Sequence, residues 1–188
     1  MEQWLAKARR IDPDSVVIAL LEADLLGIQE RGTESESRYR EILGRKGLDP
    51  VQAAVVSNNL AFHLAEPKTA AEARKLVDAA IGTLGPHPDL LDTRGMVLLA
   101  QGASREAVAD LQQAILQPSD VKFLHLACAH LQAGDKAAAR EALERGRKKG
   151  LSAARLTAAD RSRLRELEAA LGVAPGQAGP GEVDAGRG

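Results

Sequence analysis

Large aromatic side chains are scarce in this chain: Phe, Trp and Tyr make up only 2% of its 188 residues, although 45% of the residues are hydrophobic. A hydrophobic core must therefore be built from Ala, Leu, Val and Ile, which suits helices that pack closely through small residues. Because Ala and Leu are strong helix formers and aromatic strand formers are few, the composition favours an all-α fold.

Cysteine is almost absent as well. The single Cys128 excludes an internal disulfide, and no clustered set of Cys and His residues suggests a zinc site. The first ten residues mix Trp4 and Leu5 with several charges and lack the apolar stretch of a signal peptide. No apolar run approaches the length of a membrane span. These absences favour a cytoplasmic protein.

The chain also lacks an excess of charge of one sign. It has 25 Lys and Arg residues and 26 Asp and Glu residues, for a net charge of -1. Such a chain has no overall field to attract a nucleic-acid backbone or an anionic membrane. Neither is expected as a partner.

The chain does contain an internal repeat. Small residues recur at Ala61, Gly95 and Ala127, at intervals of 34 and then 32 residues, and the same two intervals relate other positions. These are Ala73, Ala107 and Ala139; Val77, Leu111 and Leu143; Ala80, Ala114 and Gly146; and Lys68, Gly102 and Gly134 at the expected turn between helices. Apolar residues around these positions follow helical spacing, so each unit is predicted to be an amphipathic helical hairpin.

Residues that start and stop helices support the same units. The second helices are expected to open at Thr33, Thr69, Ser104 and Asp135, with Glu36 and Glu72 completing two capping boxes. The first helices are expected to open near Pro13, Pro50, Pro88 and Pro118, since proline tolerates the first turn of a helix and blocks the continuation of the preceding one.

The segment from Val51 to Gly150 resembles the tetratricopeptide repeat, a helical hairpin of about 34 residues with small residues at its crossings. The stretch from Asp92 to Gly102 is especially similar to repeats of large bacterial proteins. Arg94 and His130 stand where the family usually has apolar residues, and Lys68 replaces the turn glycine. The resemblance implies a right-handed superhelical solenoid of antiparallel helical hairpins.

This pattern divides the chain into seven parts. They are a half-repeat helix at 1–11, a degenerate repeat at 12–49, repeats at 50–85, 86–118 and 119–150, a capping helix at 151–171 opened by Thr157, and a disordered tail at 172–188. A leading half-repeat with a terminal cap predicts that the chain is the C-terminal part of a longer solenoid.

Catalytic patterns are lacking. His125 and His130 are five residues apart, a spacing that does not place them on one helical face, and Cys128 between them is typical of a packed small side chain. Neither a dinucleotide-binding nor a phosphate-binding glycine motif is present. The sequence therefore predicts a protein that is not an enzyme and that needs no metal or cofactor.

The resemblance instead implies a binding groove, because the first helices of such hairpins line the concave wall of the solenoid. Thirteen residues are expected to face that groove: Val55, Asn58, Phe62, Glu66, Asp89, Asp92, Met96, Leu99, Val121, Leu124, His125, Cys128 and Gln132. Three acidic residues among them disfavour the basic clamp with which related domains hold acidic chaperone tails. The row Asn59, Thr93 and His125 lacks the asparagine ladder of glycosyltransferase-associated arrays.

The predicted function is a scaffold that binds a peptide or helix of a partner protein, with a basic or amphipathic partner favoured. Two alternatives remain open. In the first, the chain would be the accessory repeat region of a larger multidomain enzyme or secretion-related protein. In the second, it would be an array that associates with itself through Trp4 and Leu5 of the half-repeat.

Overall fold

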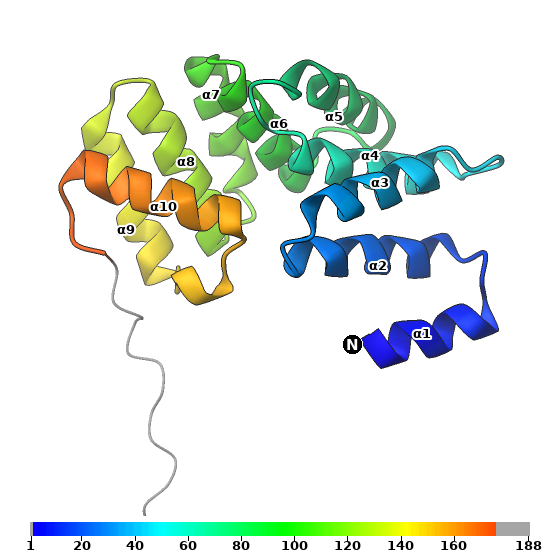
Figure 1. The fold of residues 1–188 in the computed structure, drawn as a ribbon. Coiled ribbons are helices and arrows are strands. Elements are labelled where there is room, and N and C mark those ends of the chain that lie inside the picture. Colours follow the sequence, from blue (N-terminus) through cyan, green and yellow to red (C-terminus); the bar gives the residue numbers. More distant parts are fainter. Residues whose placement is uncertain (1, 176–188) are drawn as a thin grey trace, which may run out of the picture.

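The structure is a computed structural model that describes residues 2–175, and these residues form ten α-helices, one short 3-10 helix and no strand (Figure 1). The helices are α1 (Glu2–Ile11), α2 (Val16–Ile28), α3 (Gly32–Leu43), α4 (Pro50–His63), α5 (Ala70–Leu84), α6 (Pro88–Ala100), α7 (Ser104–Ala114), α8 (Asp120–Gln132), α9 (Lys136–Lys148) and α10 (Ala158–Leu171). The 3-10 helix, Ala153–Arg155, lies between α9 and α10.

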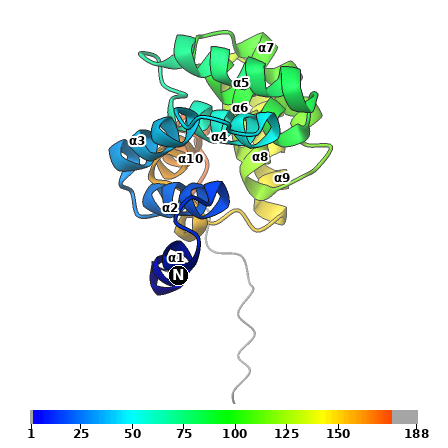
Figure 2. The same cartoon turned by 90° about the vertical axis from the view of Figure 1, so that its right-hand side faces the viewer.

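Eight of these helices form four hairpins, α2 with α3, α4 with α5, α6 with α7, and α8 with α9. The second helix of each of the first three hairpins also packs on the first helix of the next, and α4, α6 and α8 contact one another in turn. The stack curves so that these first helices form its inner wall (Figures 1 and 2). The predicted solenoid of antiparallel helical hairpins is confirmed.

Small residues hold the paired helices close together, as the repeat predicts. Ala61, Ala73 and their equivalents in the later hairpins are fully buried. Gly95 is the tightest position, since a Cβ atom there would lie 2.5 Å from Leu111 Cγ on α7. A side chain at this crossing would push α6 and α7 apart.

The predicted helix starts are correct in part. Pro50 and Pro88 occupy the first turns of α4 and α6, while the side chains of Asp135 and Thr157 accept amide hydrogen bonds from Ala138 and Asp160. The two predicted capping boxes are wrong. Thr33 lies inside α3, and the Thr69 hydroxyl donates to the Leu64 carbonyl 2.7 Å away instead of capping α5.

Arg94, which departs from the repeat pattern, has a partner within its own hairpin. Its guanidinium donates two hydrogen bonds, of 2.6 and 2.8 Å, to the carboxylate of Asp110, which is 6% exposed. A fork-to-fork pair of this kind joins α6 and α7 and satisfies a carboxylate that would otherwise be buried alone.

The C-terminal helix α10 folds back onto the last hairpin and buries Leu164, Leu167 and Leu171. Gly172 ends the helix in the left-handed conformation, Val173 packs against the same core, and Arg147 donates to the Ala174 carbonyl. The structure thus differs from the expected disordered tail at residues 172–174, which packing and hydrogen bonds hold in place. Residues 176–188 lie outside the described part of the chain.

Within residues 2–175, no helix is both long enough and apolar enough to cross a membrane.

Candidate functional site

The candidate site is the inner wall of the solenoid together with α10, which lies across part of that wall. α10 packs on α8, and in Figure 1 it crosses in front of the last hairpin with its N-terminal end toward α2 and α3. Arg161 on α10 pairs with Glu30, the residue that follows α2 by two positions, so the two ends of the curve are linked. The first half of the inner face of α8 is therefore covered, while its C-terminal end and the inner faces of α4 and α6 stay open.

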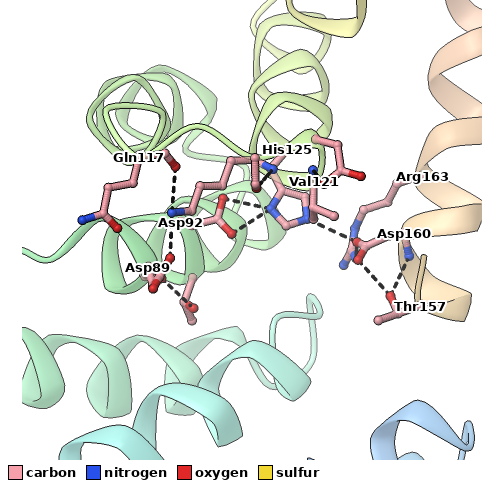
Figure 3. A network of polar contacts seen from close by, with 12 residues as sticks. Asp89, Asp92, Gln117, Val121, His125, Thr157, Asp160 and Arg163 are labelled. Carbon is pink, nitrogen blue, oxygen red and sulfur yellow. Dashed lines mark hydrogen bonds and ion pairs between the residues drawn. The ribbon is translucent and has the colours of Figure 1, made fainter. Parts of the chain in front are cut away.

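A buried charge network anchors α10 to this wall (Figure 3). His125 on α8 is fully buried between Asp92 on α6, 2.9 Å from Nδ1, and Asp160 on α10, 3.3 Å from Nε2. Asp160 also accepts hydrogen bonds from Thr157 at 2.9 Å and from Arg163 at 2.8 Å. One imidazole thus connects three helices that are far apart in the sequence.

The electrostatics of this network favour a charged histidine. Burial alone would lower the pKa of His125, but the charge of Asp92 and the hydrogen bonds of Asp160 and Asp92 outweigh it and raise the pKa to about 9. Burial would raise the pKa of Asp160, yet the hydrogen bond and charge of His125, with Arg163, hold it well below its usual range. At neutral pH the network is an imidazolium between two carboxylates.

Two clefts lie along the part of the inner wall that α10 leaves open. One, of about 520 Å³, is bordered by α2, α4, α6 and the start of α10, and the other, of about 440 Å³, by the ends of α4, α6 and α8 and the middle of α10. Ala65, Glu66 and Arg163 line both. Because the two clefts share these residues, they lie side by side along α10, and together they are called the groove.

The half of the groove next to α2 is acidic. Phe62, Tyr39 and His63 line it, and among the described residues its charged lining consists of one arginine, Arg163, and five carboxylates: Asp24, Glu30, Glu66, Asp89 and Asp92. Burial lowers the pKa of His63 against the opposing charges of Asp24 and Glu36, so this ring adds no positive charge at neutral pH.

The other half is mainly apolar. Glu66, Gln132 and Glu166 also line it, but its apolar walls are formed by side chains from α6, α8 and α10: Met96, Leu99, Ala100, Cys128, Leu131 and Leu167. Burial raises the pKa of the Cys128 thiol to about 12, so the thiol is protonated at neutral pH and serves as a small apolar contact.

Nine of the thirteen residues predicted to face the groove line one or both clefts. They are Asn58, Phe62, Glu66, Asp89, Asp92, Met96, Leu99, Cys128 and Gln132. Among them, Met96 is only 3% exposed and contributes more to the floor than to an accessible surface.

The other four predicted residues do not line either cleft. Leu124 and His125 have no exposed surface, so the prediction that these two residues face a partner is wrong. The reason is α10, which covers the first half of the inner face of α8. Val121 is half-buried against the same core as Leu124 and lies outside both clefts. Val55 is half-buried and lies outside both clefts.

Sequence reasoning missed several groove residues on other elements. Asp24 and Tyr39 belong to the degenerate first hairpin, and Arg163, Glu166 and Leu167 belong to α10. A signal for Asp24 was present, because it precedes Asn58 by the 34-residue interval of the repeat. The α10 residues have no such signal, since their place in the groove depends on how the chain folds back.

The described residues contain no group of three or more His, Cys, Asp or Glu side chains that could hold a metal ion.

The architecture of the inner wall and its curved stack of hairpins is that of tetratricopeptide-repeat proteins. Compared by sequence, the chain matches no protein-family model and no curated protein. Compared by structure, it matches tetratricopeptide-repeat proteins. The pilus biogenesis factor PilW superposes with a TM-score of 0.64 and 22% identity, over 89% of this chain and 76% of PilW.

Two other matches show the same fold. PilF of Pseudomonas aeruginosa superposes with a TM-score of 0.58 and 21% identity, over 88% of this chain and 72% of PilF. Cut9, from the Cut9–Hcn1 hetero-tetramer of the APC/C, gives a TM-score of 0.67 at 16% identity, over 96% of this chain but 36% of the matched chain. The predicted fold class is therefore confirmed, and at these identities the likeness concerns the fold.

Proposed function

We propose that the chain is a protein-interaction scaffold that binds a segment of a partner protein in the groove beside α10. The observation that carries this proposal is the open groove over α4 and α6, made of two adjoining clefts whose walls combine apolar side chains with carboxylates. Grooves with an apolar floor and a polar rim are the usual sites at which a helix or peptide docks. The structural neighbours support the general role, because PilW is described as a biogenesis factor and Cut9 was solved in a complex with Hcn1.

Site-specific photocrosslinking tests this proposal. A photoreactive amino acid is placed at Leu99 in the groove and, as a matched control, at the exposed Arg105 on α7. We expect protein adducts from the Leu99 position and few from the Arg105 position. In a second variant, Leu99→Arg, burial of a charge against the partner should reduce partner capture at least about tenfold with an unchanged helical spectrum.

Equal adduct yields from both positions, or unaltered capture by the Leu99→Arg variant, would refute the groove as the binding site.

A second candidate function is self-association, which rests on a separate observation. Trp4 and Ile11 on α1 are 77% and 86% exposed, and Val17, Leu21 and Ile28 on α2 are exposed as well. Exposed apolar side chains on neighbouring elements are typical of association surfaces.

A further inference from the structure

We propose that the occupant of the groove is an amphipathic helix of a partner protein that carries Lys or Arg at one end and apolar side chains at the other. This inference rests on the proposed function and specifies the chemistry of the partner. Three features of the groove support it: its charge balance, its division into two halves, and the helix that already lies on the same wall.

The charge balance follows from pairing each carboxylate with its own cation. In the acidic half Glu30 pairs with Arg161, Asp89 pairs with Lys122 at 2.6 Å, and Asp92 pairs with His125. Asp24 and Glu66 have no cationic partner within the described residues.

The rim of the apolar half adds to this excess. Glu166 accepts a hydrogen bond from the neutral hydroxyl of Ser162, whereas Arg163, the lining cation, is already bound to Asp160. Three carboxylates along one groove therefore remain to attract a positively charged segment.

The acidic half also contains oxygen atoms that can accept hydrogen bonds from a bound partner. Tyr39 and Asn59 donate to the same oxygen of Asp24, at 2.6 and 3.1 Å, so this carboxylate is held in place by neutral groups. The buried Oδ1 atom of Asn58 has no hydrogen-bond partner among the described residues. Lys and Arg side chains supply donors and no acceptor, which fits this set of groups.

An aromatic ring lies beside these acceptors. Phe62 borders the cleft and is half-buried, with its ring 6.2 Å from that of His125. A guanidinium or ammonium group of the partner that pairs with Glu66 or Asp24 would lie in the same cleft as Phe62, whose ring can add a cation–π attraction.

The helix α10 shows what kind of element this wall accepts. α10 places Leu164, Leu167 and Leu171 against the last hairpin, and Leu167 also forms a wall of the apolar half of the groove. The inner faces of α4 and α6 continue the surface that α10 uses on α8. A second helix lying beside α10 would contact Leu99 and Leu131 with its apolar end and reach Glu66 and Asp24 with its basic end.

Three synthetic, fluorescently labelled peptides of about four helical turns test this inference. The first has Leu residues along one face of its first half and three Arg in its second half; the second carries Glu in place of Arg; the third carries Ser in place of Leu. Binding is measured by fluorescence anisotropy at low and at physiological salt. We expect the Leu/Arg peptide to bind at least tenfold more tightly than either of the others, and to weaken as salt rises.

Charge-reversal variants locate the contact. Glu66→Lys should weaken binding of the Leu/Arg peptide about tenfold, while Glu141→Lys, which changes a different exposed carboxylate, on α9, should alter it less than twofold. Circular dichroism of both variants confirms that the helices are intact. A loss at Glu66 without a loss at Glu141 supports the inference.

Several results would overturn it. Equal binding of the Arg and Glu peptides, equal effects of Glu66→Lys and Glu141→Lys, or no binding of any peptide would each refute a basic amphipathic partner. The proposed function would survive those results as long as Leu99 still forms adducts with a partner. If the adducts from Leu99 prove to be a second copy of this chain, the occupant is the chain itself, and the inference of a separate basic partner is wrong.

Discussion

At the scale of single residues, the fold depends on positions where a side chain is absent. Gly95 allows α6 and α7 to approach so closely that any Cβ atom would overlap Leu111. In α5 the equally helical Gly82 has no atom within 4 Å of the place where a Cβ would stand. The two glycines therefore play opposite parts, and only Gly95 belongs to the repeat of small residues at helix crossings, although both would weaken an isolated helix.

Substitution of both glycines by alanine makes a matched test. Gly95→Ala should destabilise the protein by about 1–3 kcal/mol, because α6 and α7 must separate to accept the methyl group. Gly82→Ala should stabilise it by about 0.5–1 kcal/mol, because alanine restricts the unfolded chain and fits the open helix surface. Urea unfolding followed by circular dichroism measures both changes, and a destabilising Gly82→Ala or a neutral Gly95→Ala would contradict the packing described for these helices.

At the scale of elements, α10 determines which part of the inner wall is open. Its attachment combines three buried leucines with the network of Asp92, His125 and Asp160. Because the folded-state pKa of His125 is raised from 6.5 to about 9, its contribution to stability is complete below about pH 6.5 and is lost as the pH rises through about 9. Asp160, whose pKa is lowered, contributes above its ordinary pKa and loses that contribution only in acid.

The stability of the protein should consequently fall in mild alkali. We expect the free energy of unfolding to drop by ~3 kcal/mol between about pH 6 and pH 10, which is the linkage value of the shift from 6.5 to about 9. In the Asp92→Asn variant, which removes the largest favourable charge near His125, the drop should be smaller and should begin at lower pH. Urea unfolding at several pH values measures both curves, and parallel curves for the two proteins would exclude His125 as the titrating group.

The sequence predicts the positions of the helices better than the contacts of their individual side chains. The intervals of 34 and 32 residues predict the second helices α5, α7 and α9 in their correct register. Extended upstream, the 34-residue interval leads from Ala61 to Gly27, where a Cβ would lie 2.9 Å from a ring atom of His63. The repeat interval could not predict whether Thr33 and Thr69 cap their helices. The backbone group with which a threonine hydroxyl forms a hydrogen bond depends on the conformation of the turn around it.

At the scale of the whole molecule, the solenoid has two edges with different surfaces. The last hairpin is covered by α10, whereas α1 and α2 expose large apolar side chains, among them Trp4 and Ile11. Since each repeat in a solenoid buries its core against a neighbour, an uncovered apolar edge favours association with another surface.

Light scattering coupled to size-exclusion chromatography tests this edge. We expect the average mass to rise with protein concentration in the unaltered chain and to stay monomeric in a Trp4→Ser/Ile11→Ser double variant. Leu116→Ser is the control, because Leu116 is 79% exposed but follows α7, away from the α1 and α2 edge. A strictly monomeric unaltered chain at every concentration, or an equal effect of Leu116→Ser, would exclude self-association through α1 and α2.

The sequence by itself determined the helices, their pairing and most of the inner wall, because these depend on local spacing: small residues at crossings and one apolar stripe per helix recur at a constant interval. Only the tertiary structure decided which part of that wall is open. α10 returns to α8 through Leu167 and the charges around His125, contacts between residues more than thirty positions apart that no periodic pattern encodes. That return buries Leu124 and His125 and leaves the groove over α4 and α6.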